Sequence, residues 1–251
     1  MERWFEAEHA APFAAFGIPH LAALGGALLA VLALYGLRSK LRHPRRAACG
    51  RYALATLLTA SEALLNVWYI REGIFSAKST LPLELCSISL YLSILMLLTR
   101  SRLLFGIVYF AGIGGALQAL ITPALDFGYP HFRFWQFFAA HTAIILAALY
   151  MVWVERFRPT LKSIAVTMGF LNALVVIVGY VNHVTGGNYM FLARKPDTPS
   201  LLDYLGPYPW YLLSMEGIAL LTFSFLYLPF ARFPGSRGAI SGQSLSSEKD
   251  A

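Results

Sequence analysis

The chain has 251 residues, of which 57% are hydrophobic and 13% are charged, and its formal net charge is +7. Soluble domains carry about 25% charged residues, so this composition argues against an ordinary soluble domain and predicts a polytopic membrane protein. The two cysteines, Cys49 and Cys86, lie in different segments without metal-binding spacing, so we expect neither a disulfide framework nor a metal site. We attribute the positive charge to membrane topology and expect no nucleic-acid partner.

Seven apolar runs meet the length of about 20 residues that a spanning helix needs. They predict an all-α bundle of about seven transmembrane helices: Gly17–Leu37, Tyr52–Ile70, Leu81–Thr99, Leu103–Ile121, Phe134–Val154, Thr160–Asn182 and Tyr208–Phe230. The short connections leave no room for a soluble domain, so residues 1–234 are predicted to form one transmembrane domain. The Ser/Gly-rich, charged stretch 235–251 is predicted to be a disordered tail.

The distribution of basic residues predicts the orientation of the bundle. Most of the 20 Lys and Arg residues fall in alternate connections and in the C-terminal tail. Cytoplasmic loops carry an excess of Lys and Arg, so we expect the N-terminus outside and the C-terminus in the cytoplasm.

Polar side chains within the predicted helices concentrate in the outer half of the membrane. They include His20, Glu62, Asn66, Glu84, Gln118, Gln136, His141, Asn172, Asn182 and Glu216. Ionisable groups at membrane depth are costly and usually face a bundle interior or a water-filled cavity. We therefore expect a shared cavity in the outer half, although Glu62 and Glu216 could instead pair with Asn66 or Asn172 to hold helices together.

The stretch Leu81–Ser89 combines a carboxylate and a thiol at the start of an apolar run. Pro82 is expected in the first turn of this helix, and Glu84 near the positive end of the helix dipole. Cys86 beside ionisable groups is a candidate nucleophile, because the thiolate is the reactive form. The alternative is a small hydrophobic core residue, and His141 could likewise be a hydrogen-bonded core histidine. Cys49 lacks polar neighbours and is assigned no role.

The longest predicted outer loop, His183–Pro207, mixes turn residues with apolar anchors. Residues Ser200–Leu205 are expected to form a short surface helix. Structured loops on a rigid scaffold often carry function, but this loop could also simply cap the bundle.

Four segments together resemble the bacterial YwaF-like integral membrane family over nearly the whole chain. They are Pro82–Ser87, Gly114–Leu120, Pro130–Phe134 with His141, and Asn188–Leu192 with Lys195–Ser200. That family is similar to a eukaryotic transmembrane acyltransferase of ether phospholipids and, more distantly, to androgen-induced hydrolases of lipid esters. The resemblance implies a multi-pass protein of the bacterial cytoplasmic membrane with a Cys/His acyl-transfer site at Cys86 and His141. Glu84 departs from the pattern, which often has histidine there.

The leading hypothesis is therefore a lipid acyltransferase or lipid esterase that needs no cofactor. Cys86 would form a thioester while His141 acts as general base and then acid. The other candidates are Glu84, Glu62, Asn66 and Glu216 as orienting or supporting groups, and Gln118, His131, Arg133, Gln136 and Asn188 as oxyanion or substrate contacts.

The alternative is a non-enzymatic binder or transporter of lipid or small solute, in which the buried carboxylates and His141 form a proton relay. A retinal pigment is disfavoured because Tyr208–Phe230 contains no lysine. The sequence indicates a membrane lipid as substrate and no particular protein partner.

Overall fold

The computed structural model describes residues 4–7, 11–195 and 201–231, and this part of the chain is helical apart from connections and one isolated β-bridge. The predicted tail, 235–251, lies outside the described residues. The helices are α1 (Ile18–Leu41), α2 (Pro44–Arg71), α3 (Leu85–Thr99), α4 (Arg102–Ile107), α5 (Ile113–Ile121), α6 (Phe132–Trp153), α7 (Leu161–Thr185) and α8 (Trp210–Tyr227). A π-helical stretch, Val108–Gly112, joins α4 to α5. Short 3-10 turns span Tyr189–Phe191, Leu201–Leu205 and Leu228–Phe230, the second of which confirms the short helix expected in the long loop.

Six of the helical segments are long and apolar enough to cross a membrane, which confirms the all-α, multi-pass architecture. They are α1, α2, the continuous segment 102–121, α6, α7 and the segment 210–230. The seventh expected helix is shorter than predicted, because α3 has 15 residues and a length of only about 22 Å. The prediction of a spanning helix from Leu81 is therefore wrong in its starting point.

The residues just before α3 do not join the helix, because of Pro82 and because of hydrogen bonds to a residue distant in the sequence. Pro82 disfavours helical geometry at Leu81, and the N–H of Leu83 donates to the carbonyl of Leu81 at 2.8 Å in a tight turn. The N–H of Leu81 donates to the hydroxyl of Tyr189 at 2.9 Å. Pro82 is consequently not in the first helical turn, and Glu84 is the N-cap residue of α3.

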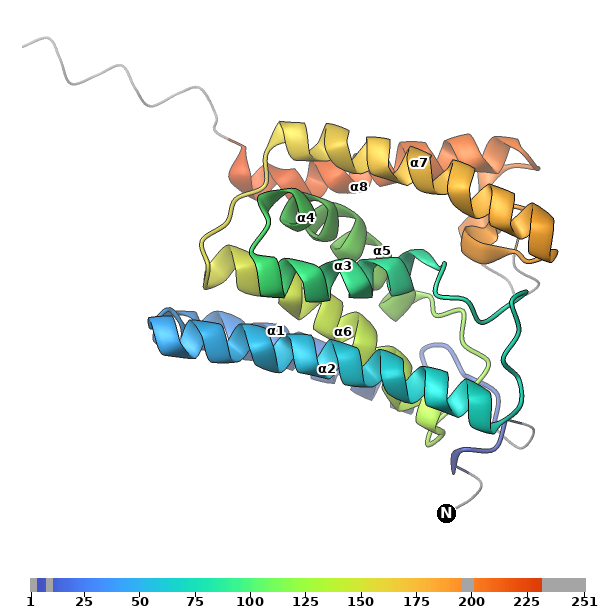
Figure 1. Ribbon diagram of the computed structural model, residues 1–251, viewed down its shortest axis with the longest axis horizontal. Coiled ribbons are helices and arrows are strands. Elements are labelled where there is room, and N and C mark those ends of the chain that lie inside the picture. The colour runs from blue at the N-terminus through green and yellow to red at the C-terminus, as the bar shows by residue number, and fades with distance from the viewer. Residues whose placement is uncertain (1–3, 8–10, 196–200, 232–251) are drawn as a thin grey trace, which may run out of the picture.

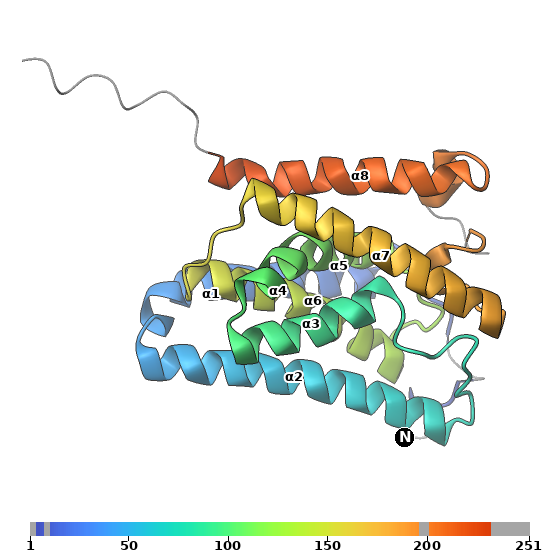
Figure 2. The same ribbon diagram turned by 45° about the horizontal axis from the view of Figure 1, so that its top comes forward.

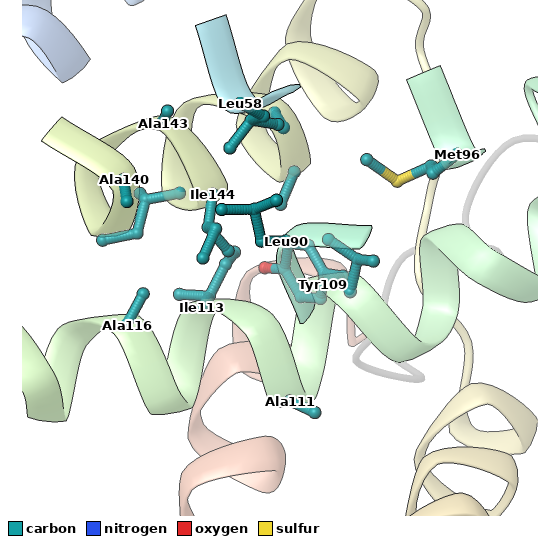
Figure 3. Packing of buried hydrophobic residues seen from close by; sticks show 14 of the residues in the cluster. Leu58, Leu90, Met96, Tyr109, Ala111, Ile113, Ala116, Ala140, Ala143 and Ile144 are labelled. Carbon is teal, nitrogen blue, oxygen red and sulfur yellow. The ribbon is translucent and has the colours of Figure 1, made fainter. Parts of the chain in front are cut away.

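Helix α6 lies at the centre of the bundle and packs against α1, α2, α3 and α5. Figures 1 and 2 show α7 and α8 together on one side of the bundle and α2 on the opposite side. The buried core forms where these helices meet, and Leu58, Leu90, Ile113 and Ile144 interdigitate there (Figure 3).

The two ends of the bundle differ in their connections. The end at which α2 and α7 finish and α3 and α6 begin carries the segments 72–84 and 186–195; we call it the loop-rich end (right in Figure 1). The N-terminal segment docks here as well, because Trp68 donates to the carbonyl of Phe5 at 2.6 Å and the N–H of Ala7 to Glu72 at 3.1 Å. At the opposite end Arg51 and Glu155 form an ion pair at 3.0 Å.

Candidate functional site

Cys86 is the second residue of α3, at the loop-rich end, and it is half-buried. The first N–H groups of a helix have no partner within it, and the N-terminus carries a partial positive charge. The carboxylate of Glu84 does not cap α3; it accepts from the N–H of Met190 at 3.0 Å. Among the described residues, the backbone N–H groups of Leu85, Cys86 and Ser87 make no hydrogen bond. A thiol and free backbone donors thus lie together at this helix start.

The hydrogen bond of His141 defines its tautomer. Its Nδ1 lies 2.7 Å from the carbonyl oxygen of Phe137, one turn earlier in α6. A carbonyl can only accept, so Nδ1 carries the proton and Nε2 of the neutral ring has a free lone pair. His141 is buried, yet it keeps one nitrogen that can accept a proton.

Helices α3 and α6, which carry Cys86 and His141, meet at Gly112. A β-carbon on Gly112 would lie 3.7 Å from Cβ of Ser89 and 3.3 Å from Cγ2 of Ile144. Ser89 and Ile144 follow Cys86 and His141 by three residues on helices that pack together and both begin at the loop-rich end. Cys86 and His141 therefore each lie about one helical turn before the point at which α3 and α6 meet at Gly112. Among the described residues, no hydrogen bond joins the thiol to His141.

A second polar cluster joins α2, α3 and α6. Glu62 accepts from Asn66 at 3.3 Å and from Tyr91 at 3.2 Å. The alternative pairing of Glu62 with Asn66 is present but lies within α2, so Tyr91 rather than Asn66 joins Glu62 to another helix. The amide of Gln136 donates to Ser61 at 3.3 Å. These hydrogen bonds tie three helices together; Ser61, Glu62 and Gln136 are buried, whereas Tyr91 is 40% exposed.

Arg133 extends this cluster towards the loop-rich end. One of its guanidinium nitrogens donates to the amide oxygen of Gln136, whereas its buried Nε has no hydrogen-bond partner among the described residues. The guanidinium carbon lies 5.9 Å from the ring centre of Trp68 and 5.8 Å from that of Tyr69, within the range of cation–π attraction. Arg133 therefore retains donor capacity for an anion.

His131 precedes α6 and caps it, because its Nδ1 accepts from the N–H of Arg133 at 3.1 Å. Burial lowers the pKa of His131, and the positive charge of Arg133 acts in the same direction. His131 is consequently neutral near pH 7, and Arg133 is the cation at this position.

The remaining candidate residues make no hydrogen bond that links them to Cys86 or His141 within the described part of the chain. Gln118 is exposed on α5, and Glu216 is half-buried on α8; neither side chain makes a hydrogen bond within the described part of the chain. The amide of Asn188 is used inside its own loop, where it donates to the carbonyl of Arg194 at 2.9 Å and accepts from Ala193 and Arg194.

A shallow hollow of about 360 Å³ lies elsewhere, between α2 and α3. Its lining is mostly small or apolar: Tyr52, Ala55, Thr56, Thr59, Ala60, Ala63, Ile94 and Leu98. None of the predicted site residues lines it, so the shared polar cavity expected in the outer half stays a prediction.

Three buried polar groups have roles that the sequence did not reveal. His20 accepts from the N–H of Phe16 at 2.9 Å and donates to the carbonyl of Leu120 at 2.8 Å, so both ring nitrogens are used structurally. Asn182 binds the backbone of the long loop, and Glu155 pairs with two arginines. In the sequence, only the apolar residues around them mark these three as unusual. Their structural roles could not be predicted, because their partners lie far away in the sequence.

The helical architecture and the polar groups at membrane depth define a multi-pass integral membrane protein. The chain belongs to the TMEM164 family, whose model matches residues 14–227. No curated protein and no solved structure matches the chain. Family membership agrees with the predicted membrane class, whereas the YwaF-like resemblance and the chemistry that it implies stay predictions.

Proposed function

We propose that the protein transfers acyl groups between membrane lipids, or releases them to water, through a thioester on Cys86. The observation that carries this proposal is the hydrogen bond of His141, which leaves the lone pair of Nε2 free on α6, a helix that packs against the helix that bears the thiol. The thiolate rather than the thiol is the nucleophile, so the thiol needs a base that takes its proton as it attacks.

In the first half-reaction, Sγ of Cys86 attacks the carbonyl carbon of a lipid ester while Nε2 of His141 takes the thiol proton. The free N–H groups of Cys86 and Ser87 stabilise the oxyanion, in place of the expected Gln118 and Asn188. When the ester C–O bond breaks, His141 returns the proton to the leaving alkoxide. A lysolipid hydroxyl or water then attacks the thioester, His141 takes its proton, and the released thiolate is reprotonated.

The position of Arg133 supports a phospholipid substrate. Arg133 precedes His141 by two helical turns, about 12 Å along the axis, on the side of the loop-rich end. A lipid phosphate on the free guanidinium donor would leave the acyl ester deeper in the bundle, towards His141. Gln136 and the Glu62 network hold Arg133 and its neighbours in place.

We also propose that the loop-rich end faces outward in the bacterial cytoplasmic membrane. The distribution of basic residues supports this orientation. The opposite end carries Arg51 and Arg100 in its ion pairs, as expected for a cytoplasmic surface.

Labelling with an activated acyl ester tests the proposed nucleophile. The purified protein in lipid nanodiscs is treated with a thiol-reactive acyl probe and its intact mass is measured, with Cys86→Ala and Cys49→Ala measured in parallel. We expect one acyl adduct that disappears in Cys86→Ala and persists in Cys49→Ala. Equal labelling of both cysteines, or none on Cys86, would contradict the proposal.

A second candidate function is lipid or solute binding without acyl transfer. The network of Glu62, Asn66, Tyr91 and Gln136 favours it, because these polar groups gather where α2, α3 and α6 meet and the thiol is not among them. In that case Cys86→Ser would bind lipid and function as the parent does.

A further inference from the structure

We propose that residues 188–192, which we call the strap, lock the first turn of α3, and that Glu84, Asn182 and Tyr189 are positioning residues for Cys86. This inference rests on the proposed function only in taking Cys86 as the reacting group. The strap follows α7 and lies beside the segment that leads into α3, at the loop-rich end (Figures 1 and 2).

Tyr189 makes the hydrogen bonds that hold the strap against the segment before α3. Its side chain is buried, with 2% of its surface exposed. Its hydroxyl accepts from the N–H of Leu81 at 2.9 Å and donates to the carbonyl of Ala77 at 2.9 Å. The side chain of Tyr189 therefore joins two points of the segment before α3 and, as shown above, holds Leu81 out of the helix.

Asn182 fixes Tyr189 from the side of α7. Its amide donates to the carbonyl of Tyr189 at 3.0 Å and accepts from the N–H of the same residue at 2.8 Å. Asn182 is buried, so both hydrogen bonds are shielded from water. Tyr189 has its backbone fixed to α7 and its side chain fixed to the segment before α3.

Glu84 joins the strap to the start of α3. Glu84 is the N-cap residue of α3 and precedes Cys86 by two residues. Its carboxylate could accept from its own helix, but it accepts from the N–H of Met190 instead. Leu81, Leu83 and Met190 pack against Tyr189 beside this hydrogen bond, which is itself exposed.

The backbone of the strap is held in an unfavourable conformation. Met190 and Phe191 have φ angles of 56° and 54°, in the left-handed region that side chains with a β-carbon rarely adopt. The N–H of Met190 is bound by Glu84, and the carbonyl of Phe191 accepts from the hydroxyl of Tyr211 on α8. Such strain persists only where the surroundings fix the backbone, and it often occurs at functional sites. The strap thus links α7 and α8 to the start of α3.

Alkylation of Cys86 tests the strap without requiring acyl transfer. The full chain in nanodiscs is treated with N-ethylmaleimide, and the rate at Cys86 is divided by the rate at the exposed Cys49 of the same molecule. Tyr189→Phe keeps the ring and removes both hydroxyl hydrogen bonds. We expect it to raise the ratio about 2- to 10-fold, the change in local opening that a lost hydrogen bond allows. Tyr180→Phe, at an exposed tyrosine of α7, is the matched control and should leave the ratio unchanged.

Glu84 provides a second comparison that separates charge from geometry. Glu84→Gln and Glu84→Ala both remove the negative charge beside the thiol, but only glutamine keeps an acceptor for Met190. We expect a higher alkylation ratio for Glu84→Ala than for Glu84→Gln, and lower acyl-probe labelling for Glu84→Ala. Equal ratios for these two variants, or for Tyr189→Phe and Tyr180→Phe, would overturn the strap. Absent acyl labelling of the parent would instead count against the proposed function and leave the alkylation result valid.

Discussion

Replacing His141 by alanine is expected to lower the rate of acyl transfer by about 10²- to 10⁴-fold, the usual contribution of a general acid–base group. The thiol of Cys86 would lose the base that takes its proton, and the leaving alkoxide would lose its acid. The rate is measured with the acyl probe on the parent and on His141→Ala, with the helical content of both checked by circular dichroism.

His183→Ala is the control for this prediction, because His183 is an exposed histidine in the last turn of α7. It should retain the parent rate. If His141→Ala labels Cys86 as fast as the parent, His141 is a structural histidine that merely bonds to Phe137, and the proposed mechanism is wrong.

Replacing Glu155 by alanine is expected to reduce the free energy of unfolding by about 3–5 kcal/mol, as for other broken buried ion pairs. The side chains of Glu155 and Arg51 are 7% and 11% exposed, and their charged atoms lie 3.0 Å apart. Without the carboxylate, Arg51 would remain a largely buried charge that keeps a hydrogen bond to the carbonyl of Leu97 at 2.9 Å. The loss is measured by denaturant titration in detergent micelles.

Arg100→Ala provides the matched control at the same carboxylate. Arg100 binds the other oxygen of Glu155 at 2.8 Å, but its side chain is 53% exposed, so solvent screens the pair and we expect a loss of at most about 1 kcal/mol. Equal losses for Glu155→Ala and Arg100→Ala would show that burial of the Arg51 pair does not determine stability at this end.

Local sequence pattern predicted the helices well, because hydrophobic runs of spanning length are a strong signal. It failed at the start of α3. The apolar run begins at Leu81, but the hydroxyl of Tyr189, 108 residues later in the chain, binds the N–H of Leu81. A contact over that sequence distance leaves no local pattern, and the same is true of Arg51 with Glu155.

The sequence predicted which residue types belong to the candidate site, but it did not predict their hydrogen-bond partners. Polar residues in an apolar helix indicated His141 and the pair of Glu62 with Asn66. The sequence could not show that α3 and α6 are neighbours, that Nδ1 of His141 binds Phe137, or that the amide of Asn188 closes its own loop. These features depend on tertiary packing, which periodicity does not encode.

The most direct test of the central claim is to trap the acyl group on Cys86. The protein is mixed with vesicles of a phospholipid that carries a deuterated acyl chain, quenched rapidly in acid without added lysolipid, and digested for mass spectrometry. We predict a deuterated acyl adduct on the peptide that contains Cys86, released by neutral hydroxylamine as a thioester is, and absent from the peptide that contains Cys49. An unmodified Cys86 peptide, or equal adducts on both cysteines, would contradict acyl transfer through this thiol.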